Sequence, residues 1–132
     1  MRSHAVFLTL LLGCQSSDSM RAVRVAERFV FALTAHSDQG RNEACEMLDA
    51  QSVATLTERA QAAVALGASR AEPCDFLLAF SSTELSEHDR AHVVRQDADA
   101  FAVRWGGHSD LEITIVRESG ELRVRLPELQ PH

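Results

Sequence analysis

The clearest chemical signal in this sequence is a pair of histidines four positions apart, in the stretch His88-Asp89-Arg90-Ala91-His92. On a helix, histidines at this spacing share one face and can bind zinc, with a neighbouring carboxylate as general base. The carboxylate here is Asp, one methylene shorter than the usual Glu, and the stretch runs into an expected strand, where residues four apart are about 13 Å distant. His88 and His92 are therefore candidate metal ligands of a hydrolase or isomerase, with adventitious metal binding and a solvated loop as the alternatives.

Nucleophilic catalysis finds less support in the residue pattern. Serines occur in several expected loops, but none of them stands in a Gly-x-Ser-x-Gly elbow. The chain has three cysteines, and each fits a structural role better than a catalytic one. We therefore predict a non-enzymatic protein with no cofactor and no resident metal.

The first 14 residues have the layout of an export signal. Residues 1–4 carry one firm positive charge, residues 5–12 are uncharged and mostly apolar, and Gly13 is small enough to precede a peptidase cut. The apolar run of about eight residues is far shorter than the roughly 20 that a membrane-spanning helix needs. We expect residues 1–13 to be removed as a signal peptide, residues 14–18 to form a tether, and residues 19–132 to fold as one domain.

The residues Leu11-Leu12-Gly13-Cys14 resemble the lipobox of bacterial lipoprotein precursors. The resemblance implies that the Cys14 thiol takes a diacylglyceryl group and becomes the new N-terminus, held in the membrane by about 0.8 kcal/mol for each buried methylene. Gln15 does not look like an inner-membrane retention signal, which favours the outer membrane, facing the periplasm, in a bacterium with two membranes. An ordinary secretory signal, with Cys14 incidental, is the alternative.

The two remaining cysteines, Cys45 and Cys74, would fold in an oxidising compartment, where thiols pair. With Cys14 consumed by lipid, the number of thiols is even. We predict a disulfide that closes a loop of about 30 residues and contributes roughly 3 to 4 kcal/mol on the chain-entropy account. Two free buried thiols, or half of a metal site, are the alternatives.

Hydrophobic spacing predicts that the N-terminal half is helical. The first helix is expected from about Ser19, with an apolar stripe at Ala22, Ala26, Phe29 and Leu33. A short helix is expected over about 42–48, and Asp49 suits the N-cap of a third that ends at Gly67. The inward stripe of this third helix is expected at Val53, Leu56, Ala60 and Val64. Pro73 suits the first turn of a fourth helix over about 74–80.

In the C-terminal half the hydrophobic period changes to two, which is typical of strands. Four strands are expected, over about 92–95, 100–105, 111–118 and 122–126. Turn-forming residues separate them, and Glu118-Ser119-Gly120-Glu121 has the form of a tight hairpin. The fold class is therefore α+β, with three to four N-terminal helices packed on a curved four-stranded antiparallel meander.

This order of elements resembles that of small lipoproteins of the nuclear transport factor 2-like, cystatin-like superfamily. The resemblance lies in residues 26–33 and 43–49 and in the hairpin over 116–124, and it also supports pairing Cys45 with Cys74. It implies a cone-shaped fold with a cavity, which would be lined by Phe29, Phe76, Phe101 and Trp105. Core filling by these side chains is the alternative. The superfamily's isomerase chemistry needs a Tyr, and this chain has none.

The formal net charge of −6 argues against a nucleic-acid partner, because no basic surplus exists to displace counterions from phosphates. The sequence therefore predicts a lipid-anchored cell-envelope protein that acts as a binding or interaction module. Such a module is expected to expose a sheet face or edge and to form a homodimer or bind an envelope partner. A binder of a small apolar ligand in the cone cavity is the alternative, followed by a metal-dependent hydrolase or isomerase that uses His88 and His92.

Overall fold

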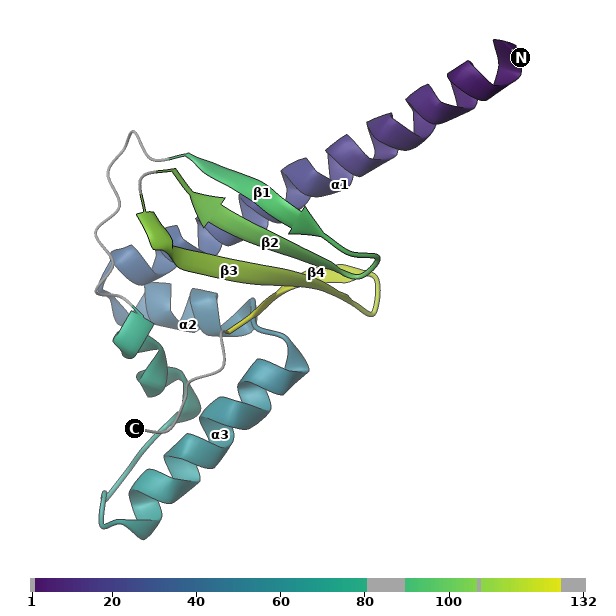
Figure 1. Ribbon diagram of the computed structural model, residues 1–132. Coiled ribbons are helices and arrows are strands. Elements are labelled where there is room, and N and C mark those ends of the chain that lie inside the picture. Colours follow the sequence, from purple (N-terminus) through teal and green to yellow (C-terminus); the bar gives the residue numbers. More distant parts are fainter. Residues whose placement is uncertain (1, 81–89, 107, 127–132) are drawn as a thin grey trace.

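The computed structural model describes residues 2–80, 90–106 and 108–126. Within these residues the chain is α+β, as expected: three α-helices and a short 3-10 helix precede four strands (Figure 1). The elements are α1 (Arg2–Thr34), α2 (Asp38–Glu46), α3 (Ala50–Ala65), η1 (Pro73–Phe80), β1 (Ala91–Gln96), β2 (Ala100–Trp105), β3 (His108–Glu118) and β4 (Glu121–Arg125).

Helix α1 packs against all four strands. Its apolar stripe is confirmed, because Ala22, Ala26, Phe29 and Leu33 are all buried. The expected start near Ser19 is wrong, since the helix runs without a break from Arg2, through the segment expected to be a tether. The chain has no Pro before Pro73, and Gly13 alone costs a helix only about 1 kcal/mol. The N-terminal half of α1 extends beyond the sheet (Figure 1).

Both shorter α-helices begin at polar caps. The Ser37 hydroxyl accepts a hydrogen bond from the Gly40 N–H at 3.0 Å, and the Asp49 carboxylate accepts one from the Ser52 N–H at 2.9 Å. Gly40 lies where α2 approaches α1 most closely, since a Cβ on it would stand 2.3 Å from the Ala32 carbonyl oxygen. Side-chain size at Gly40 therefore limits how closely these two helices pack.

Helix α3 ends before Gly67, which has a φ of +112°, as the sequence predicted. Its inward stripe is confirmed for Leu56 and Ala60 but wrong for Val53 and Val64, which are 41% and 50% exposed. The reason is that α3 extends away from the sheet (Figure 1) and is covered along one narrow face, mainly by η1. Its C-terminal half therefore leaves apolar surface in solvent.

The fourth expected helix is a 3-10 helix rather than an α-helix. It begins at Pro73, which has no backbone N–H to donate, and the Asp75 side chain accepts from the Glu72 N–H at 3.1 Å. Short helical segments often adopt this tighter form. Leu77, fully buried, anchors the segment in the core.

The four strands form one antiparallel sheet in the order β1-β2-β3-β4, which confirms the expected meander. Its inner face forms the core with α1, through the buried side chains of Phe101, Val103, Ile113, Ile115 and Val124. The hairpin between β3 and β4 turns at Ser119 and Gly120, whose φ values of 52° and 81° match a type I′ turn. Strand β1 carries a bulge between Val93 and Arg95.

Candidate functional site

Cys14, the expected lipidation site, lies within α1. From Ser17 onward, the first side chain to bond the sheet is Asp18, which accepts a hydrogen bond from Arg117 at 2.9 Å. Ser19 follows, with its hydroxyl 3.2 Å from the Gln96 side-chain oxygen. Cys14 thus precedes the body of the domain by about 6 Å along the helix axis. No helix in the described part of the chain has the length and apolarity required to cross a bilayer.

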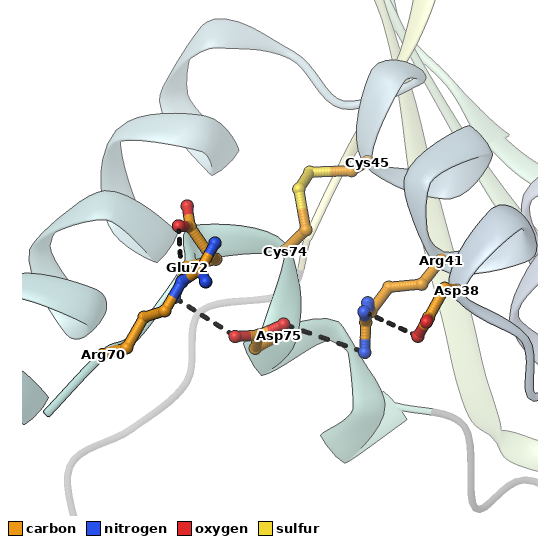
Figure 2. Close-up of polar contacts among 7 residues, drawn as sticks. All are labelled: Asp38, Arg41, Cys45, Arg70, Glu72, Cys74 and Asp75. Atoms are coloured by element: carbon orange, nitrogen blue, oxygen red, sulfur yellow. Dashed lines mark hydrogen bonds and ion pairs between the residues drawn. A yellow bond between two sulfur atoms is a disulfide. The ribbon is translucent and has the colours of Figure 1, made fainter. Parts of the chain in front are cut away.

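Cys45 and Cys74 form a disulfide that joins α2 to η1, which confirms the predicted pair (Figure 2). Their Cα atoms are 5.8 Å apart, and 29 positions separate them in the sequence. Arg41 also links α2 to η1. Its guanidinium forms ion pairs with Asp38 on its own helix at 2.9 Å and with Asp75 on η1 at 3.7 Å. The disulfide and these ion pairs together fix η1 against α2.

The candidate metal ligands are only partly placed. His88 lies outside the described residues, and His92 is an exposed residue of β1 opposite Arg104 of β2. Within residues 2–80, 90–106 and 108–126, no three His, Cys, Asp or Glu side chains come together as metal ligands would. The paired histidine site stays a prediction.

The four aromatic residues expected to line a cavity meet in one cluster. Phe29, Phe101 and Trp105 are 2%, 1% and 5% exposed, and Phe76 is partly buried against the hydrophobic core to which they belong. They come from α1, η1 and β2. In this structure they belong to the packed core, and a ligand cavity among them stays a prediction.

A groove that sequence reasoning missed runs between α1 and β1, and we call it the α1–β1 groove. Its volume is about 700 Å³, within the usual range of ligand-binding pockets. Two large apolar side chains in it are exposed, Met20 by 56% and Val94 by 39%. One face of α1 and the whole of β1 line it, through Ser19, Met20, Val23, Arg24, Glu27 and residues 91–96.

The two edges of the sheet differ in how they are covered. Beside β4, the segment that leads into α3 forms a parallel bridge: the Asp49 N–H donates to the Val124 carbonyl, and the Val124 N–H donates to the Met47 carbonyl, both at 2.8 Å. Among the described residues, no strand pairs with the outer edge of β1. The α1–β1 groove therefore lies beside the edge strand of the sheet that pairs with no other described strand, and Figure 1 shows β1 at that edge.

The outer face of the sheet beside this edge carries a surplus of positive charge. Glu112 of β3 is the shared acceptor for two guanidiniums, those of Arg95 at 2.9 Å and Arg104 at 3.0 Å. His92 stands next to Arg104 across the β1–β2 pair. One carboxylate between two arginines leaves one net positive charge on this group of three side chains.

Asp49 is a fully buried carboxylate at the start of α3, and its pKa is lowered from the ordinary value. Burial alone would raise the pKa of this carboxyl. Hydrogen bonds from Ser52, and the Arg125 guanidinium at 2.7 Å, outweigh burial and lower the pKa. Ser52 also accepts a bond from the Leu126 N–H at 2.9 Å, so this cluster ties the start of α3 to the end of β4. Its role is structural.

No protein-family model matches this sequence, and neither a curated protein nor a solved structure shows significant similarity to it.

Proposed function

We propose that this chain is a lipid-anchored cell-envelope protein whose domain acts as a non-enzymatic interaction module. The observation that carries the proposal is the position of Cys14: it ends a lipobox-like tetrapeptide on α1, only four residues before Asp18, which is bonded to the sheet. Acylation there would hold the domain against the bilayer surface, in the outer membrane and facing the periplasm where two membranes exist.

The disulfide fits this location. Cys45 and Cys74 are bonded to each other, and disulfides persist in oxidising compartments such as the periplasm. Cys14 is then left as the one cysteine outside the bond, which suits its use as the lipid attachment point.

For the fold, we propose the nuclear transport factor 2-like arrangement, in which helices pack on the inner face of a bent antiparallel sheet. The support is the order of elements, helices first and then a meander, together with the contacts of α1 with all four strands. Members of that superfamily include both enzymes and binding modules, so the fold does not assign the role.

The interaction role is supported by the edge of β1, which pairs with no second strand among the described residues, and by the α1–β1 groove beside it. Exposed strand edges present unpaired backbone groups that other chains can join. An envelope protein partner or a second copy of this chain would find its contact there.

Metabolic labelling with an alkyne-bearing fatty acid tests the anchor. After export in a bacterial host, the wild-type chain should carry the label and lose residues 1–13. A Cys14→Ser variant should carry none, while a Cys45→Ser/Cys74→Ser variant, which changes the other two cysteines, should be labelled normally. Label on the Cys14→Ser chain, or its absence from wild type, would contradict the proposal.

A further inference from the structure

We propose that the α1–β1 groove binds an extended peptide of alternating apolar and acidic residues, which joins the free edge of β1 as an added strand. Strand addition of this kind takes its affinity from main-chain hydrogen bonds and its specificity from alternate side chains. The inference rests on the proposed role as an interaction module and names the chemistry of the partner.

The backbone of β1 presents its hydrogen-bonding groups on the groove side. The Gly106 N–H donates to the Arg90 carbonyl at 3.0 Å, which makes the pair Ala91–Trp105 one of the non-hydrogen-bonded pairs of the β1–β2 ladder. Ala91, and Val93 two positions on, therefore direct their N–H and C=O groups away from β2. Both residues line the groove, so an incoming strand would meet donors and acceptors there.

The inner side of the groove selects apolar residues at every second position of the peptide. Side chains of an added strand alternate between the two faces of the sheet. On the face shared with the core, α1 presents Met20 and Val23, of which Met20 is 56% exposed. Apolar side chains of the peptide would cover this surface.

The outer side selects acidic residues at the intervening positions. There the added strand would lie beside Arg95 and His92. On this face Glu112 is the one carboxylate paired with both Arg95 and Arg104. Across the groove, on the α1 side, Arg24 adds a further exposed cation, and it forms no ion pair with any described residue. Glu27 is the single carboxylate among the lining residues.

Charge also argues for a peptide over a second copy of the chain. A twofold β1–β1 pairing would bring Arg95 of one copy close to Arg95 of the other. Like charges opposite each other on neighbouring strands are destabilising. An acidic strand makes the opposite, favourable contact with the same residues.

The test uses the full chain, purified in mild detergent, and a dye-labelled heptapeptide of alternating valine and glutamate. Fluorescence anisotropy should show saturable binding. Arg24→Glu should weaken it by about fivefold to tenfold. The matched control is Arg28→Glu, an exposed arginine one turn further along α1 and outside the groove lining, which should change the affinity by less than about twofold.

Three altered peptides separate the parts of the proposal. Two of these peptides are N-methylated, one at every valine and the other at every glutamate, so each lacks the N–H donors of one edge. The peptide that loses the donors facing β1 should bind at least about tenfold more weakly than the parent. Replacing glutamate by lysine should weaken binding by a similar factor. The proposal would be overturned if both N-methylated peptides bound as tightly as the parent peptide, or if the lysine peptide did.

Other occupants predict different results. If vesicles rich in phosphatidylglycerol bind through Arg24 while the peptide does not, the groove serves a lipid surface and the proposal is wrong. If the chain dimerises through β1 and binds no peptide, a second copy is the partner and the proposal is equally wrong. Peptide binding does not depend on acylation, so absence of label on Cys14 would overturn the anchor alone.

Discussion

Replacing Asp49 by alanine should destabilise this protein by about 2 to 3 kcal/mol. Loss of an N-cap side chain costs about 1 kcal/mol, and loss of a hydrogen bond to a charged partner costs about 1.5 to 3 kcal/mol. Arg125, the partner at 2.7 Å, is 41% exposed, so water recovers part of its bond and the lower half of that range applies. Asp49 itself is 0% exposed, so no water replaces its contact with Ser52.

Urea denaturation, followed by the fluorescence of Trp105, measures this loss. Trp105 is the single tryptophan and is buried, so its emission reports unfolding of the core. Asp38→Ala is the matched control: Asp38 also pairs with an arginine at the start of a helix, but its side chain is 89% exposed, and its loss should cost no more than about 0.5 kcal/mol. Equal costs for the two variants would refute the reasoning.

The same cluster predicts a dependence on pH. Its hydrogen bonds hold the pKa of Asp49 below its ordinary value of 3.8, so the ionised carboxylate stabilises the folded state at neutral pH. That stabilisation should be lost as the pH falls below about 4 towards the folded-state pKa. Asp49→Asn keeps an oxygen for the cap but cannot ionise, so its stability should fall less steeply with acid than that of wild type. Parallel acid curves for the two proteins would contradict the assignment.

Two further predictions concern packing. A Cys45→Ala/Cys74→Ala variant should lose about 3 to 4 kcal/mol of unfolding free energy by urea denaturation, and an unchanged midpoint would show that the disulfide does not stabilise the fold. Gly40→Ala should lose about 1 to 3 kcal/mol, because its new Cβ meets the Ala32 carbonyl of α1, whereas the same change at Gly67 meets open space and should cost about 1 kcal/mol from its positive φ alone. Thermal melts of the two alanine variants, compared side by side, check this order.

The sequence predicted the elements that depend on local pattern. The stripe of α1, the Asp49 cap, the four strands and the Ser119-Gly120 turn each follow from spacing or backbone preference within a few residues. The disulfide was also predictable, because an expected export signal and an even number of remaining thiols favour a pair.

The errors arose where distant contacts decide the outcome. Val53 and Val64 fit a helical stripe, but α3 is contacted mainly by η1 and these two side chains stay exposed. The segment that begins at Pro73 was expected to be an α-helix, but it is a 3-10 helix, which short helical segments often adopt. The α1–β1 groove is lined by segments about 70 positions apart in the sequence. The sequence indicated only that the first strand of a meander lies at an edge of the sheet, which stays open unless another element covers it.

The most direct test of the central claim is the intact mass of the protein extracted from the membrane of its host. The account predicts a chain that begins at Cys14, carries a diacylglyceryl group, and is two hydrogens lighter for the bond between Cys45 and Cys74. A mass that matches an unlipidated chain, whether it begins at Met1 or is cut at another position, would contradict the lipid anchor.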